Sequence, residues 1–117
     1  MKDIVKQYVG IWNTGAVSDL PQVFSEQSQY WDATQEGSAI EVLSGSVAGT
    51  YDAFSEVSFE ILTLAETTEG RWVLEWHMKG THTGNFFGAE PTGKQISIKG
   101  LDLMTVNAEC ISGIRSY

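Results

Sequence analysis

The feature that most constrains the fold is a change in hydrophobic period just after Phe54. Before it, apolar residues recur at helical spacing, as Ile4, Tyr8 and Trp12 do within residues 2–14. After it, apolar and polar residues alternate to the end of the chain, which is the period of half-buried strands. Helices followed by a run of strands are typical of an α+β fold, with the helices packed on one face of an antiparallel sheet.

The N-terminal half predicts three helices and one short strand. Gly15 follows the first helix where a left-handed cap is needed, and Ser18 can cap a short second helix. Ser38 and Glu41 have the spacing of a capping box at the start of the third helix. The expected elements are helices over residues 2–14, 18–24 and 38–54, and a strand over residues 29–33.

The C-terminal half predicts a meander of four strands, each antiparallel to the next. The expected strands cover residues 55–66, 71–83, 94–107 and 110–117. They are joined by a turn over residues 67–70, a longer loop over residues 84–93 and a tight turn over residues 107–109. The 117 residues are expected to form a single domain over residues 1–117, because two cores would each be too small to be stable.

Charge and composition exclude several classes of protein. The formal charge of −8, from 15 acidic and 7 basic residues, repels nucleic-acid phosphates and anionic membranes, so we expect neither as a partner. No apolar run approaches the roughly 20 residues that span a bilayer, and the first residues do not resemble a signal peptide, so we expect a cytoplasmic protein. The single cysteine, Cys110, has no partner for a disulfide or a metal site, and we expect no cofactor and no metal.

One carboxylate falls on an apolar strand face. Between Ile96 and Val106 the even-numbered positions are apolar or glycine except for Asp102, and they share one face of the strand. A buried carboxylate is costly unless it is hydrogen-bonded, paired or protonated, and such groups cluster at functional sites. Two other interpretations stay open: a structural hydrogen bond, or a bulge that turns Asp102 outward.

A histidine falls on the apolar face of the preceding strand. His82 shares its parity with Trp72, Leu74, Trp76 and Met78. A histidine in this position can carry a proton or bind a ligand, or it can be a core residue with a structural hydrogen bond.

Proton transfer is the chemistry that the remaining residues favour. The sequence has no Gly-x-Ser-x-Gly elbow, and residues 80–84 lack the lysine of a phosphate-binding loop. Tyr8 lies on the apolar stripe of the first helix, and Asp32 shares its parity with Tyr30. Asp32 is either a pocket acid or a turn residue that ends its strand. With Asp102 and His82, these residues predict acid/base chemistry in an apolar pocket.

Two groups of short motifs carry a family resemblance. The first is YVGIWNTG at residues 8–15 with YWD at residues 30–32, and the second is GTHTG at residues 80–84 with GLDL at residues 100–103. With these motifs the chain resembles, over essentially its whole length, the nuclear transport factor 2-like superfamily, which includes ketosteroid isomerases and SnoaL-like polyketide cyclases. The resemblance implies a cone: a curved antiparallel sheet of about four or five strands wrapped on about three N-terminal helices.

The resemblance also implies roles for the candidate residues. By similarity to the isomerases, Asp32 is the general base, Tyr8 the oxyanion-hole hydroxyl and Asp102 the protonated acid beside it. By similarity to the cyclases, His82 and Asp102 line a pocket for an aldol-type ring closure. The expected substrate is a small hydrophobic carbonyl compound that reacts through an enolate, with Asp32 as base and Tyr8, Asp102 and His82 as donors.

Two other functions stay open, because a fold does not fix a function. The chain can be a non-catalytic small-molecule binding protein, or an epoxide hydrolase, which needs an arginine between two acids. The expected ligand-binding residues are Trp12, Tyr30, Trp72, Trp76, Met78, Phe86, Phe87 and Met104. We also expect a homodimer through the outer face of the meander, because exposed sheet faces in small domains need covering.

Overall fold

The structure is a computed structural model that describes residues 2–86, 88–107 and 110–117. Phe87 and two residues of the turn expected over residues 107–109 lie outside this description. The elements, in chain order, are α1 (Lys2–Thr14), the 3₁₀-helix η1 (Val17–Gln22), β1 (Phe24–Trp31), β2 (Glu36–Ser38), α2 (Ala39–Ala53), β3 (Phe54–Thr68), β4 (Arg71–His82), β5 (Gln95–Val106) and β6 (Ile111–Ser116).

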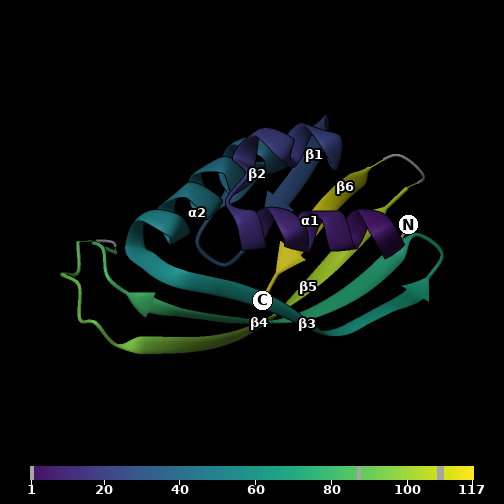
Figure 1. The fold of residues 1–117 in the computed structure, drawn as a ribbon. Coiled ribbons are helices and arrows are strands. Elements are labelled where there is room, and N and C mark those ends of the chain that lie inside the picture. The colour runs from purple at the N-terminus through teal and green to yellow at the C-terminus, as the bar shows by residue number, and fades with distance from the viewer. Residues whose placement is uncertain (1, 87, 108–109) are drawn as a thin grey trace.

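A curved six-stranded sheet forms one layer of the molecule, and the helices cover its concave face (Figure 1). The strand order is β2-β1-β6-β5-β4-β3. Helix α1 lies above the inner side of the long strands and contacts β3, whereas α2 packs beside β1. The α+β cone is thereby confirmed, with helices on one face of the sheet as the order of the elements predicted.

The expected all-antiparallel pairing is wrong at one place in the sheet. Strands β1 and β6 run parallel, with Tyr30 opposite Ile114 and Trp31 opposite Arg115. Antiparallel neighbours can be recognised from the short turn that joins them. Most of the chain lies between β1 and β6, so no turn signal in the sequence reveals their pairing. The short strand β2, which pairs antiparallel with β1, was also missed. Three residues are too few for alternation to be visible in the sequence.

Two expectations for the N-terminal half also need correction. The second helix is a 3₁₀-helix with Pro21 inside it, and it ends at Gln22 because β1 already begins at Phe24. The expected capping box at Ser38 does not form, since the Ser38 side chain makes no capping hydrogen bond. Ser38 instead closes β2 opposite Gln29, and the chain enters α2 directly from that strand.

The helical stripe of α1 forms the upper half of the core. Its buried residues are Val5, Tyr8, Val9 and Ile11. The helix ends where predicted, because Gly15 adopts a φ of +74° and its N–H donates to the Ile11 carbonyl at 2.8 Å.

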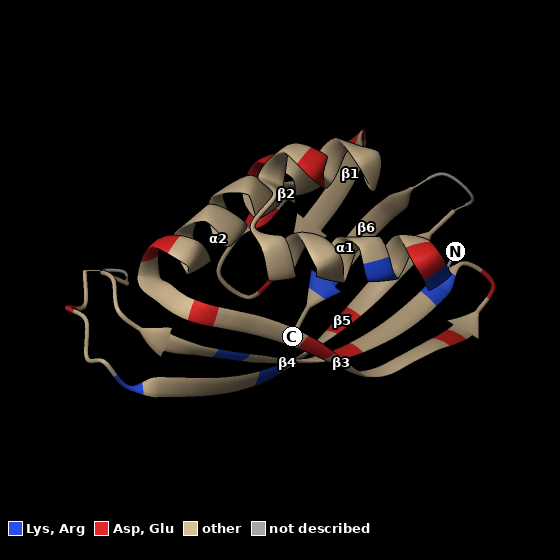
Figure 2. Ribbon diagram, viewed as in Figure 1, with Lys and Arg blue, Asp and Glu red and all other residues tan. Residues whose placement is uncertain are grey.

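Alternation in the long strands forms the lower half of the core. The buried side chains of β4 and β5 belong to even-numbered positions, as the sequence predicted: Leu74, Met78, His82, Asp102, Met104 and Val106. Acidic residues are spread over helices, strands and turns rather than gathered on one element (Figure 2). Among the described residues, no helix is both long enough and apolar enough to cross a membrane.

Candidate active site

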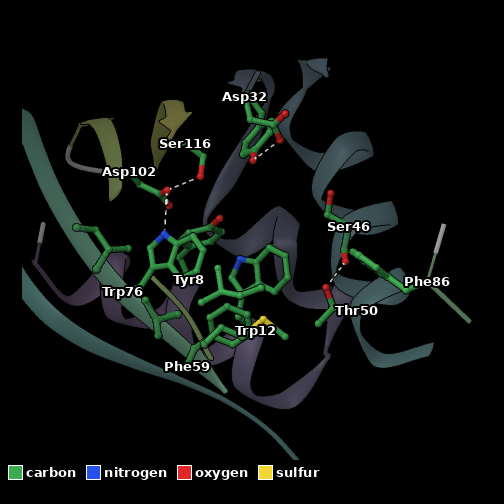
Figure 3. A pocket seen from close by; sticks show the side chains of 15 residues that line it. Tyr8, Trp12, Asp32, Ser46, Thr50, Phe59, Trp76, Phe86, Asp102 and Ser116 are labelled. Carbon is green, nitrogen blue, oxygen red and sulfur yellow. Dashed lines mark hydrogen bonds between the residues drawn. The ribbon is translucent and has the colours of Figure 1, made fainter. Parts of the chain in front are cut away.

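A cavity of about 340 Å³ lies between the helices and the concave face of the sheet. Most of its walls are aromatic or aliphatic, so a few polar groups decide what it binds and how (Figure 3). Its lining residues are Tyr8, Val9, Trp12, Tyr30, Asp32, Ser46, Thr50, Phe59, Leu74, Trp76, Met78, Phe86, Ile98, Asp102 and Ser116.

Asp102 is the buried acid of this cavity, with a side chain only 4% exposed. The Trp76 indole N–H donates to its Oδ1 at 3.1 Å, and the Ser116 hydroxyl donates to the same oxygen at 2.7 Å (Figure 3). Burial raises the pKa of Asp102, and these two hydrogen bonds reverse only part of that rise. Asp102 can therefore exchange a proton at a pH closer to neutral than an ordinary aspartate.

The second oxygen of Asp102 has no hydrogen-bond partner among the described residues. The Trp76 indole and the Ser116 hydroxyl both bind Oδ1, and Asp102 lines the cavity, so Oδ2 is available to a ligand. The alternative in which a bulge turns Asp102 outward does not hold, because Asp102 stays in register opposite Leu74 and Ser116.

Tyr8 brings a hydroxyl to the same cavity from α1. Its side chain is 3% exposed and lines the cavity. Burial raises the pKa of Tyr8 well above its ordinary value, and the charge of Asp102 raises it further. The phenol therefore keeps its proton and is available as a hydrogen-bond donor to an oxygen of a ligand.

Gly100 makes the contact between Trp76 and Asp102 possible. Gly100 and Trp76 are cross-strand partners on β5 and β4. The indole lies across Gly100, so that a Cβ placed there would collide with three of the ring carbons. Because Gly100 has no side chain, the ring can cover it and direct its N–H to the next inward residue of β5, Asp102.

Asp32 lies at the end of β1, where its carboxylate is held by a turn. The Thr34 N–H and hydroxyl each donate to Oδ1 at 2.7 Å, and the Gln35 N–H donates to it at 3.0 Å. The Tyr30 hydroxyl donates to Oδ2 at 2.9 Å. Burial acts to raise the pKa of Asp32, but the hydrogen bonds from Thr34, Tyr30 and Gln35 outweigh it and lower the pKa. Asp32 is therefore both a turn residue and a cavity residue, and it is a weak base.

The structure brings most of the predicted site residues together. Those that line the cavity are Tyr8, Trp12, Tyr30, Asp32, Trp76, Met78, Phe86 and Asp102. Trp72 and Met104 do not line it: both face inward, but Met104 is 1% exposed within the core and Trp72 packs against the same core cluster. Strand parity assigns a side chain to a face, and only the packing above that face decides whether core or cavity lies there.

His82 also faces inward without lining the cavity. Its ring packs against Phe54 and Phe86, with centroids 5.4 and 6.4 Å away, and Nδ1 lies 3.1 Å from the Thr92 hydroxyl. The His82 backbone hydrogen-bonds Lys94 and Gly93. These contacts anchor the loop that carries Phe86, so the geometry supports a positioning role for His82 over direct proton transfer.

Three polar residues of the cavity, Ser46, Thr50 and Ser116, were not predicted from the sequence. Ser116 follows Ile114 at alternate spacing on β6, so its parity could have revealed it. Ser46 and Thr50 lie one turn apart on α2, and the spacing of both from the buried Leu43 is a helical one. In Figure 3 these two residues lie on the side of the cavity opposite Asp102 and Ser116.

Both arginines lie away from the cavity. Arg71 and Arg115 line a second, open groove on the other face of the sheet, beside Trp31 and Tyr117. An epoxide hydrolase of this fold needs a guanidinium between its two acids, and neither arginine lines the cavity that holds Asp32 and Asp102.

Solved structures with the same fold are numerous. AclR from Streptomyces galilaeus has a TM-score of 0.86 at 20% identity, over 99% of this chain and 76% of that one. TsrD from Streptomyces laurentii has a TM-score of 0.85 at 12% identity, over 98% and 84% of the two chains. A protein with a ketosteroid isomerase-like fold from Catenulispora acidiphila, in complex with trimethylamine, has a TM-score of 0.78 at 18% identity, over 97% and 83%.

Sequence comparison gives the family. A search of curated proteins found no match. The model of the SnoaL-like polyketide cyclase family, in contrast, matches residues 2–117, which is nearly the whole chain and includes every residue of the cavity. This chain therefore belongs to the SnoaL-like polyketide cyclase family.

Proposed function

We propose that this protein is an acid/base enzyme that acts on a small, largely apolar carbonyl compound, by ring closure or by isomerisation through an enolate. The family supports a cyclase or isomerase type of function in general terms. The observation that carries the proposal of this reaction is Asp102, a buried carboxyl in the lining of an apolar cavity, whose Oδ1 is held by two donors and whose Oδ2 is held by none among the described residues.

In the proposed reaction, Oδ2 of ionised Asp102 removes a proton from the carbon next to the substrate carbonyl. The electron pair of the broken C–H bond forms an enolate, whose oxygen accepts a hydrogen bond from the Tyr8 hydroxyl. In a cyclase, the enolate carbon then attacks a second carbonyl of the same molecule, and Asp102 returns its proton to the new alkoxide. In an isomerase, Asp102 returns the proton to a different carbon.

The choice of Asp102 over Asp32 as the base differs from the role that the isomerase resemblance implies. A general base works best when its pKa lies near the working pH. Burial moves the pKa of Asp102 in that direction, whereas the turn around Asp32 moves its pKa the opposite way. Both carboxylate oxygens of Asp32 also accept hydrogen bonds already, from Tyr30, Thr34 and Gln35.

Deuterium exchange tests this proposal without knowledge of the natural substrate. Cyclic ketones and β-diketones small enough for the cavity are incubated with the enzyme in D₂O, and loss of the α-proton signal is followed by NMR. We expect Asp102→Asn to slow the catalysed exchange by about 100-fold or more, and Asp32→Asn by less than about tenfold. Equal rates for the wild type and Asp102→Asn would refute the assignment.

The same experiment separates the enzyme from a binding protein on this fold. A binding protein would shift the ligand signals in the NMR spectrum and leave the exchange rate at that of buffer. That outcome would favour the non-catalytic alternative, in which the carboxyl groups only orient the ligand.

We also propose that the protein is a homodimer through the outer face of the sheet. Exposed apolar side chains support this: Trp31 is 36%, Leu101 38% and Tyr117 60% exposed, and the Trp31 and Tyr117 rings pack together 5.5 Å apart. Sedimentation equilibrium of the wild type and of Trp31→Glu tests it. We expect the substitution to produce a monomer, and a monomeric wild type at micromolar concentration would exclude the dimer.

A further inference from the structure

The cavity has an unusual set of charges. Two of its lining residues, Asp32 and Asp102, are acidic, and none of the fifteen is lysine, arginine or histidine. The groups that hydrogen-bond the two carboxyls are all neutral: the hydroxyls of Tyr30, Thr34 and Ser116, an indole, an amide side chain and backbone N–H groups. Negative charge in the cavity is therefore not balanced by a cationic side chain of its lining.

The two acids contribute to this field differently. The Asp32 carboxylate is held in its ionised form by the turn, so it carries its charge at any pH near neutral. Asp102 is almost fully buried and lines the cavity, and its Oδ2 has no hydrogen-bond partner among the described residues, so this atom is available to a ligand. An anion that enters would meet the permanent negative charge of Asp32, which is partly exposed, and the buried acid Asp102, around which charges interact more strongly than in water.

The walls of the cavity are suited to a positive charge. Trp12, Phe59 and Trp76 form a continuous aromatic surface, with ring centroids 4.9 Å apart for the first pair and 5.9 Å for the second. The faces of such rings attract cations, and Trp does so most strongly. Aromatic faces together with unbalanced carboxylates favour a bound ammonium group over a bound carboxylate.

We propose that this cavity selects its ligands by charge and that Asp32 sets this preference. The cavity accepts neutral carbonyl compounds and those that carry a protonated amine, and it rejects carboxylates and phosphates. The substrate class proposed above thereby narrows to neutral or amine-bearing carbonyl compounds. Only this narrowing rests on the proposed function, because the charge preference itself concerns binding and does not require catalysis.

Three probes of nearly equal shape test the charge preference. Benzylammonium, benzyl alcohol and benzoate each fit the cavity, and their dissociation constants can be measured at pH 7 and low salt from quenching of tryptophan fluorescence. We expect benzylammonium to bind most tightly and benzoate to bind at least about tenfold more weakly than benzyl alcohol. Equal affinities for benzoate and benzyl alcohol would overturn the proposal.

Variants identify the residue that is responsible. In Asp32→Asn, where the new amide oxygen can still accept the turn hydrogen bonds, benzoate should gain affinity and benzylammonium should lose it, while benzyl alcohol stays within about twofold. Asp32→Ser gives a second neutral residue that can close the same turn. Glu26→Gln, at an exposed position on β1 outside the cavity, removes the same net charge and should leave all three affinities unchanged.

The outcomes separate this inference from the proposed function. If the affinities of Asp32→Asn and Asp32→Ser for benzoate and benzylammonium equal those of the wild type, Asp32 does not set the preference, whatever the exchange rates are. If the charge order is found but Asp102→Asn exchanges protons as fast as the wild type, the catalytic proposal fails and the charge preference stands.

Discussion

Gly100→Ala most sharply tests the contact between Trp76 and Asp102, although Gly100 itself does not line the cavity. The methyl group would overlap the Trp76 indole, which lies across Gly100, so the ring must move. Its N–H then no longer reaches Oδ1 of Asp102, to which it donates at 3.1 Å. That hydrogen bond lowers the pKa of Asp102, so its loss should raise the pKa further.

The magnitude follows from the kind of hydrogen bond that is lost. A hydrogen bond to a charged group contributes about 1.5–3 kcal/mol. If the hydrogen bond stabilises only the ionised carboxylate, its loss lowers the acid dissociation constant of Asp102 by about tenfold to a hundredfold. The overlap with the ring should also destabilise the fold by about 1–3 kcal/mol, which is typical of an overfilled core.

The assay is a pH titration of the Asp102 carboxyl carbon by NMR in protein labelled at aspartate. Trp76→Phe is the matched control, because it removes the N–H without adding bulk next to Gly100. We expect both variants to titrate at higher pH than the wild type. If Trp76→Phe shifts and Gly100→Ala does not, the indole is not displaced. If neither shifts, the hydrogen bond does not influence the acid.

Three further predictions concern stability and the residues around the site. Burial raises the pKa of Asp102, so the folded protein binds the proton of this carboxyl more tightly than the unfolded chain does. The resulting stabilisation of the fold is complete below about pH 4 and is lost as the pH rises through the raised pKa. The unfolding free energy of Asp102→Asn relative to wild type should therefore increase from pH 4 to pH 7 in urea titrations, and a constant difference would contradict this. His82→Phe should keep deuterium exchange within about tenfold of wild type, because His82 does not line the cavity; a loss as large as that of Asp102→Asn would show direct participation. Gly15→Ala should lower the unfolding free energy by about 1–2 kcal/mol, since the left-handed φ of +74° strains a residue with a side chain and the added Cβ would lie 3.3 Å from the Tyr51 ring. Gly10→Ala, inside α1 with open space around it, is the control and should not destabilise.

Local sequence patterns predicted the long helices and strands and the inner faces of α1, β4 and β5, but not β2. Helical spacing in residues 2–14 placed Tyr8 on the buried side of α1, and alternation between Ile96 and Val106 placed Asp102 on the inner face of β5. These properties follow from the local geometry of helices and strands, in which spacing along the chain fixes the direction of a side chain. The sequence of a single strand is therefore enough to predict that an acid on it faces inward.

Whether an inward side chain packs in the core or lines the cavity depends on the tertiary structure. Strand parity treats Met104 and Asp102 alike, yet one is core and the other lines the cavity, because the packing of α1 and α2 determines where space remains. The parallel pairing of β1 with β6 joins segments from opposite ends of the chain, which no local pattern encodes.

The different proton affinities of the two acids are likewise a product of tertiary and turn geometry. Asp32 and Asp102 are the same residue type, and the sequence alone gives them the same pKa. Burial acts to raise the pKa of Asp32, but donor groups of three nearby residues outweigh it and lower this pKa, whereas the helices and sheet that bury Asp102 raise the pKa of Asp102. Burial depends on what packs above a residue, and the packing partners of Asp102 come from α1, β4 and β6, far from it along the chain.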